Sequence, residues 1–309
     1  MPEPETETRR LSPRPSLSVV VASCNSPEAL ERCLESLTAE LPADGQLIVA
    51  DCSTADPRPG FSQHYPDIRF LRFEEKLSIP ELRREGIKAA RGEIVALTEG
   101  RTVPSAGWLN ALLEAHARHP EAAGVGGPID HAGRSAFEWA VFFCEYGWHM
   151  PPAPEGAAEL LSGANLSYKR WALEACWELI EEAAWEPFVH RRLEQLGHPL
   201  RRAGQAVVCY HNSLTAAQFL RQRFHYGRWF AAARVEGRPI LGRLLYAAFT
   251  PLLPAVLLFR LCRLVFARGR NRAWFLRAFP WMAAFQMAWS LGECCGYLLG
   301  KGRSHRQVF

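Results

Sequence analysis

The feature that most constrains the fold is an alternation of short apolar strands and amphipathic helices between residues 17 and 99. The runs LSVVVA, LIVA and IVALT are continuously apolar and rich in β-branched residues, which is typical of strands buried on both faces. Connections between them are short, so the alternation predicts an α/β fold with a parallel sheet and helices on both faces. Strands are predicted at Leu17–Ala22, Leu47–Ala50, Ile68–Phe73 and Ile94–Thr98, and helices from Ser26-Pro27 onward and over Glu81–Ala90.

Polar residues follow three of these strands directly. They are Ser23-Cys24-Asn25, Asp51-Cys52-Ser53 and Thr98-Glu99-Gly100-Arg101. In open α/β sheets ligands bind beyond the carboxyl ends of the strands, so the three clusters are expected to meet at one site.

The order of six further patterns carries a family resemblance. They are VVVASCN, LIVADCSTAD, LRREGIKAARGEI, IVALTEGRTVPSAGW, SGANLSYKR and a glutamate ahead of RRLEQLG. Each is weak alone, but together and in this order they resemble the family 2 glycosyltransferases over roughly residues 17–235. The resemblance implies a GT-A (Rossmann-like) fold with a mixed sheet, and transfer of a sugar from a nucleotide-sugar with inversion.

The resemblance also implies a set of donor-binding residues. Ala50 stands where the family usually has a second acidic residue, which leaves Asp51 to hold the base or ribose. For Asp51 a turn or helix-capping role is the plain alternative, and surface charge is the alternative for the arginines. The predicted donor residues are Asn25, Asp51, Ser53, Arg83, Arg84, Glu99 and Arg101.

The family's metal-binding signature is altered here to Glu99-Gly100-Arg101. Mg²⁺ and Mn²⁺ favour carboxylate oxygens, and only Glu99 offers them. Arg101 cannot bind a cation but could contact a diphosphate directly. The sequence therefore leaves open a one-carboxylate metal site helped by His211, catalysis with little or no metal, and loss of activity.

Glu186 stands at the position of the family's general base, between Trp185 and Pro187. A surface glutamate is the alternative, and Glu181 and Glu182 are competitors for the role. On the acceptor side the resemblance implies Asn165, Trp185 and Arg223, the last in the basic and aromatic helix FLRQRFHYGRWFAAAR.

The C-terminal part from Gly237 onward contains one acidic residue, Glu293, beside many arginines. Two uncharged runs, Leu244–Phe259 and Ala278–Gly292, fall short of the about 20 apolar residues of a spanning helix, and basic residues lie before, between and after them. Because spanning would carry the middle arginines across the membrane, two interfacial or re-entrant helices are favoured over a spanning hairpin or a soluble core.

These observations divide the chain into a disordered tail (1–16), a glycosyltransferase domain (17–235, with a nucleotide half to about 122 and an acceptor half from about 123) and a hydrophobic membrane-associated segment (236–309). Nine scattered cysteines without metal-like spacing and the absence of an apolar N-terminal run favour a cytoplasmic catalytic domain. With 36 basic and 32 acidic residues, the charge balance does not suggest nucleic acid.

The sequence thus predicts a membrane-associated, inverting glycosyltransferase with a lipid- or envelope-linked acceptor. The alternative is a non-catalytic relative that binds nucleotide-sugar or lipid as a partner subunit, which the altered signature favours.

Overall fold

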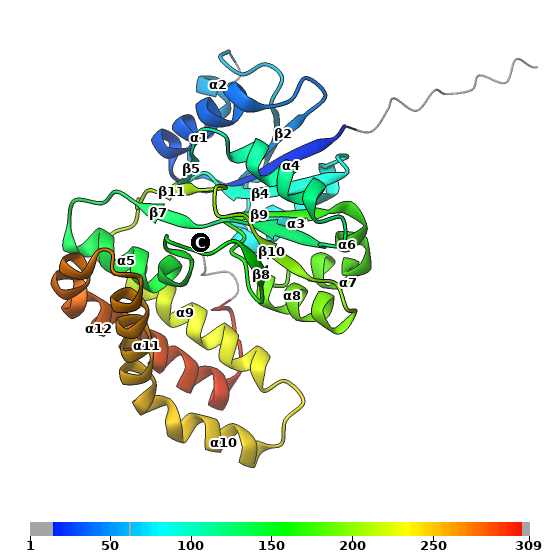
Figure 1. Ribbon diagram of the computed structural model, residues 1–309. Helices are drawn as coiled ribbons and strands as arrows, with labels where there is room; N and C mark the ends of the chain where they lie inside the picture. Colours follow the sequence, from blue (N-terminus) through cyan, green and yellow to red (C-terminus); the bar gives the residue numbers. More distant parts are fainter. Residues whose placement is uncertain (1–14, 62, 305–309) are drawn as a thin grey trace, which may run out of the picture.

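The computed structural model describes residues 15–61 and 63–304 of the 309-residue chain. It consists of an eight-stranded mixed sheet covered by helices, a small three-stranded sheet, and a group of long C-terminal helices below them (Figure 1). Most of the predicted tail, residues 1–14, lies outside the described residues. The backbone oxygens of Pro15 and Ser16 already accept hydrogen bonds from Glu93 and Ile94.

The four predicted strands form the parallel half of the large sheet. β1 (Leu17–Ser23), β2 (Gln46–Asp51), β3 (Arg69–Arg72) and β4 (Ile94–Glu99) lie in the order β3-β2-β1-β4. The predicted α/β class is confirmed. All four strands run the same way, so their carboxyl ends meet at one edge of the sheet.

Beyond β4 the sheet becomes mixed. β9 (Asn165–Lys169) runs antiparallel between β4 and β6 (Gly124–Gly126), and β10 (Leu200–Arg202) and β8 (Gly156–Ala158) complete the far edge. A second sheet joins β5 (Thr102–Pro104), β11 (Val208–Tyr210) and β7 (Ile129–His131).

The side chains of β1 point alternately to the two faces of the sheet, and each face is covered by a layer of helices. Leu17, Val19 and Val21 share one core cluster with residues of α1 (Pro27–Glu40) and α4 (Trp108–Arg118), whereas Val20 packs on the other face. Successive side chains of a strand point to opposite faces, so one apolar run holds both layers. The Val20 face is covered by α3 (Ile79–Ala89), α6 (Arg170–Ala175) and α8 (Glu186–Gln195); α2 (Arg58–Phe61) and α7 (Trp177–Glu181) are short connecting helices.

The remaining helices link the sheet to the C-terminal part. α5 (Ala136–Tyr146) continues into a 3₁₀ turn at Gly147–His149, and α9 is the long helix Ala216–Arg234. They are followed by α10 (Ile240–Phe249), a 3₁₀ turn at Thr250–Leu252, α11 (Leu253–Arg268) and α12 (Arg272–Leu299).

α12 packs lengthwise on α9 through glycines. A Cβ added to Gly292 would lie 2.0 Å from the backbone oxygen of Phe224, and one on Gly296 would lie 2.3 Å from that of Arg228. Gly227 of α9 is equally close to α12. Small residues spaced by four let two helix backbones approach closely. The run Ala278–Gly292, expected at a membrane interface, therefore buries one face against α9 and α5, including Met282 and Phe285.

α10 and α11 bury much less. Together with the turn between them they form a 29-residue stretch, Ile240–Arg268, whose most apolar 18-residue window has a mean hydropathy of 1.8 and is only 11% buried. By length and composition alone, this stretch of the described chain could cross a membrane.

Candidate active site

A hydrogen-bonded turn joins the carboxyl ends of β1 and β2. Asn25 has a φ of 51°, a left-handed conformation that asparagine tolerates better than most residues. Its backbone N–H donates to Ser53 Oγ at 2.7 Å, and its Oδ1 accepts from the Thr54 N–H at 2.8 Å. Ser53 Oγ in turn donates to Asp51 Oδ2 at 2.7 Å. Three predicted donor residues, Asn25, Asp51 and Ser53, are thus brought together.

Asp51 is committed to this turn. It is 1% exposed, and Oδ1 accepts from the Ser53 N–H at 3.0 Å and from Arg72 Nη1 at 3.2 Å. The β2–β3 register places Asp51 opposite Arg72, which explains the pair. In this arrangement Asp51 organises the turn between β1 and β2, and both of its carboxylate oxygens have protein partners.

At the end of β4 a buried network surrounds Glu99. Arg83 Nη2 donates to Glu99 Oε1 at 2.6 Å, and the Tyr146 hydroxyl donates to Oε2 at 3.2 Å. Arg101 Nη2 lies 3.8 Å from the same Oε2. Burial, reinforced by the Glu99 charge, holds the pKa of Tyr146 well above its usual value, so its hydroxyl remains a donor.

Arg83 joins Glu99 to Glu186. Glu186 is the first residue of α8, and its Oε1 accepts a hydrogen bond from Arg83 Nη1. Burial acts to lower the pKa of Arg83, but the charges of Glu186 and Glu99 outweigh it and the pKa is raised. The guanidinium expected to meet a diphosphate is therefore placed between two carboxylates. Arg84 points elsewhere, to Glu85 and to the backbone oxygen of Glu181.

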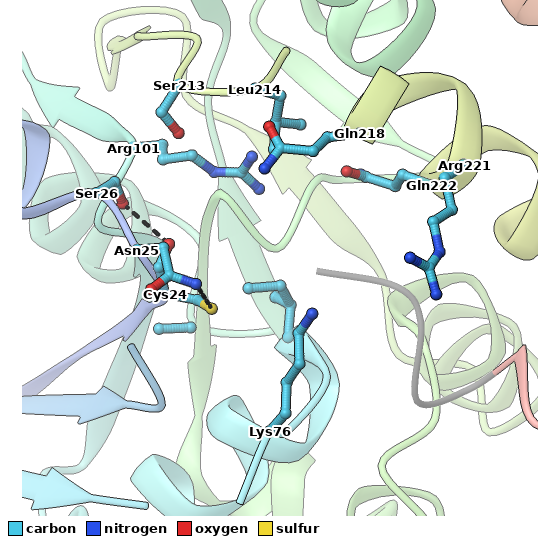
Figure 2. A pocket seen from close by; sticks show the side chains of 12 residues that line it. Cys24, Asn25, Ser26, Lys76, Arg101, Ser213, Leu214, Gln218, Arg221 and Gln222 are labelled. Atoms are coloured by element: carbon cyan, nitrogen blue, oxygen red, sulfur yellow. Dashed lines mark hydrogen bonds between the residues drawn. The ribbon is translucent and has the colours of Figure 1, made fainter. Parts of the chain in front are cut away.

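A cavity of about 250 Å³, here called the cationic cavity, opens beyond β1 and β4. Figure 2 shows Lys76, from the loop after β3, directed into it from the wall opposite Arg101 and Gln218. Of the described residues that line it, three are cationic and none is acidic. The polar and charged lining residues are Cys24, Asn25, Ser26, Lys76, Arg101, Ser213, Gln218, Arg221 and Gln222.

A second cavity of about 170 Å³, the aromatic cavity, lies beside the first, because Glu99 of its lining has Oε2 only 3.8 Å from Nη2 of Arg101, which lines the cationic cavity. It brings Glu186 and Glu99 together with rings from α5, α9 and α12 and with the ring of Trp185 at the start of α8. The Trp185 and Tyr226 ring centroids are 4.8 Å apart. Its lining includes the residues Arg83, Glu99, Tyr146, Trp185, Glu186, Arg223, Tyr226, Phe230 and Trp289.

Asn165, predicted on the acceptor side, lies buried between the two sheets. It is fully buried, its Oδ1 accepts from Trp108 Nε1 at 2.8 Å, and its Nδ2 donates to the backbone oxygens of Pro128 and Ala206. It thereby ties both sheets together, whereas Ser162 and Gly163 just before it line the aromatic cavity.

The residues present do not fit a divalent cation. Both Glu99 oxygens are engaged by Arg83 and Tyr146, and Arg101 adds a further positive charge. His211 lies nearby through its backbone N–H, which donates to the Arg101 oxygen at 2.8 Å. Within the described chain no three histidine, cysteine, aspartate or glutamate side chains form a cluster that could hold a metal.

Sequence reasoning missed several residues of the site. Lys76 and Gln218 reach the cationic cavity, while Tyr146 and Trp289 reach the aromatic one. Tyr146 and Trp289 come from α5 and α12, outside the patterns that carry the family resemblance. Among these four residues, the sequence offers a signal only for Gln218, which directly precedes the arginine-rich run Phe219–Arg234.

Comparison with solved structures shows the fold. The chain superposes on the mannosyltransferase PcManGT from Pyrobaculum calidifontis, whose structure holds GDP-Man and Mn²⁺, with a TM-score of 0.57 and 17% identity over 91% of this chain and 88% of that one. At this identity the likeness shows the fold, which is the GT-A fold of glycosyltransferases.

Residues 18–161 match the glycosyl transferase family 2 profile, so this part of the chain is similar to that family. It is also 32% identical over 88 residues to EpsH of Bacillus subtilis (strain 168), a protein named as a glycosyltransferase. That match spans 28% of this chain and 26% of EpsH.

Proposed function

We propose that this protein transfers a sugar from a nucleotide-sugar donor to a membrane- or envelope-linked acceptor, with inversion at the anomeric carbon. One observation carries the proposal: the cationic cavity and the aromatic cavity adjoin, and Glu186 lines the second. A donor diphosphate in the first cavity would direct its sugar toward the carboxylate in the second. Such a placement suits an in-line displacement.

In the proposed reaction the acceptor hydroxyl oxygen forms a bond to the anomeric carbon, and its proton passes to a Glu186 carboxylate oxygen. The bond from the anomeric carbon to the diphosphate oxygen breaks, and its electron pair leaves with the diphosphate. Arg101, which lines the cationic cavity, faces the charge that develops there. Arg83 acts as a positioning residue, because it fixes the direction of the Glu186 carboxylate.

The experiment compares wild type with Glu186→Gln for sugar transfer from a panel of nucleotide-sugars and for binding of the corresponding diphosphates by calorimetry. Transfer should fall by roughly 10²- to 10⁴-fold, the usual contribution of a general base. Nucleotide binding should stay unchanged, since Glu186 lies outside the cationic cavity. Retained transfer in Glu186→Gln would remove Glu186 from this role.

The second candidate is a non-catalytic relative that binds nucleotide-sugar. It is favoured by the engagement of Glu186 with Arg83, which occupies one oxygen of the candidate base. Diphosphate binding by wild type without transfer to any acceptor, in membranes that support a control glycosyltransferase, would select this reading.

For the membrane contact, the proposal favours interfacial attachment of α10 and α11 from the cytoplasmic side. Leu241 and Phe259 are 76% and 62% exposed, and Arg260 and Arg263 are exposed within the same apolar stretch. Charges inside the stretch suit a helix lying at lipid headgroups better than one crossing the hydrocarbon core. Extraction from membranes by alkaline carbonate would support this attachment, whereas resistance to it would favour spanning.

A further inference from the structure

At the end of β4, both carboxylate oxygens of Glu99 already accept hydrogen bonds from protein side chains. Glu99 closes the strand beside β1, opposite Ala22, where a carboxylate could face a donor diphosphate. Instead its side chain is only 8% exposed and turned into the network with Arg83 and Tyr146. Glu99 therefore serves to balance buried guanidinium charge.

A divalent cation at Glu99 would have to displace Arg83 from Oε1 or Tyr146 from Oε2. Displacing Arg83 would also disturb its hydrogen bond to Glu186. The cation would then lie close to Arg101, whose Nη2 is 3.8 Å from Glu99 Oε2. Like charges in a buried setting repel strongly, so this position disfavours Mg²⁺ or Mn²⁺.

The positive charge that a metal would supply is present in the cationic cavity itself. Arg101, two residues after Glu99, lines that cavity together with Lys76 and Arg221. An arginine guanidinium matches phosphate oxygens with two parallel N–H donors, and lysine adds a compact charge. The cavity also offers the neutral donors Asn25 and Gln218, and no acidic residue of the described chain lines it.

We infer that Arg101, with Lys76 and Arg221, takes the place of the divalent cation in binding the donor diphosphate, and that this site operates without bound metal. The inference rests on the proposed function, since it concerns the same donor. It assigns Arg83 and Glu99 to positioning: Arg83 neutralises Glu99 and thereby leaves Arg101 directed toward the cavity rather than bound in a close ion pair.

The test is calorimetric binding of UDP, GDP, dTDP, CDP and ADP to the full-length protein in detergent, in EDTA and again with Mn²⁺. At least one diphosphate should bind, with a Kd in EDTA within about 3-fold of that in Mn²⁺. Arg101→Met should weaken it by roughly 10- to 100-fold, as expected for loss of a bidentate charge-assisted contact. Arg101→Lys should recover part of the loss.

Two controls separate a diphosphate contact from a general disturbance. Binding of the matching nucleoside monophosphate should change much less in Arg101→Met than binding of the diphosphate. Arg118→Met, which alters an arginine paired with Glu155 at the exposed end of α4, should bind both like wild type.

The outcomes distinguish this inference from the proposed function. Diphosphate binding that weakens more than about 30-fold in EDTA, with the Mn²⁺ effect lost in Glu99→Gln, would place a metal on Glu99 and overturn the inference while leaving the function intact. Equal weakening of mono- and diphosphate in Arg101→Met would also overturn it. Failure of wild type to bind any of the five diphosphates would contradict both.

Discussion

The guanidinium carbon of Arg223 lies 4.2 Å from the centroid of the Trp289 ring, so that α9 and α12 meet at the wall of the aromatic cavity. Arg223 Nη1 also lies 3.9 Å from Glu145 Oε1 on α5. The C-terminal helix thus contributes directly to the pocket that contains Glu186. α12 therefore lines the aromatic cavity through Trp289 and also packs on α10 and α11.

Trp289→Leu should therefore weaken acceptor use without affecting the donor. A desolvated cation–π contact contributes about 2 kcal/mol, which corresponds to roughly a 30-fold change at most. The expected result is a raised KM for the acceptor and an unchanged Kd for nucleoside diphosphate. Leu291→Ala, at an exposed position two residues along α12, is the matched control. Equal effects of the two variants would argue against a role for Trp289 in the pocket.

Removing Arg83 should destabilise the fold. Arg83→Met would leave the buried Glu99 and the half-buried Glu186 without their shared cation, and breaking a buried pair from one side costs about 3–5 kcal/mol. Arg84→Met, next to it on α3, should cost less than about 1 kcal/mol because its contacts are partly exposed. Urea unfolding of both variants measures the difference. A loss in Arg83→Met as small as in Arg84→Met would show that the network is not important for stability.

The buried histidine His190 should make stability fall in acid. Burial, with a smaller effect of His149, lowers the pKa of His190 to about 3, and its Nδ1 accepts from the Leu161 N–H at 3.5 Å. The unfolded chain binds a proton near pH 6.5 and the folded one does not until about 3, so stability decreases as pH falls through that window. The contribution is up to about 1.4 kcal/mol per pH unit.

His190→Gln should accordingly flatten the pH dependence of the unfolding free energy between about pH 6.5 and pH 4.5. His198→Gln, at the half-buried turn after α8, is the control and should retain the wild-type slope. Parallel slopes in wild type and His190→Gln would contradict the prediction.

The glycine contacts between α9 and α12 predict opposite effects for two identical substitutions. Gly292→Ala would push a methyl group against the Phe224 backbone oxygen and should cost at least about 2 kcal/mol. Gly242→Ala, in α10 with open space around it, should stabilise by about 0.5–1 kcal/mol through helix propensity. Thermal or urea unfolding of the pair tests this. Two stabilised variants would mean that the helices can separate at little cost.

The strands were predictable because their signal is local. β1, β2 and β4 begin and end within one residue of their apolar runs, since continuous β-branched sequence and a polar residue at the end mark a buried parallel strand. The helix predicted over Glu81–Ala90 corresponds to α3. It begins two residues earlier than predicted, at Ile79 after the capping residue Ser78.

The side-chain network was less predictable because it depends on tertiary placement. Arg72 meets Asp51 only through the register of β3 on β2. The motif predicts Arg83 at the diphosphate, but the packing of α3 on β1 and β2 places it among carboxylates instead. The burial of α12 follows from the small-residue spacing of Gly292 and Gly296, whereas the hydrophobicity of the run Ala278–Gly292 alone suggests an interface.

The close contact of α9 with α12 also bears on which acceptors can react. α9 and α12 carry the aromatic wall beside Glu186, and α12 also packs on α10 and α11, which hold the exposed apolar stretch. With the proposed membrane attachment, the reacting centre then stands at a constant height above the lipid surface. An acceptor must raise its hydroxyl to that height, so the protein would select the spacer between lipid anchor and hydroxyl by its length as well as by its chemistry.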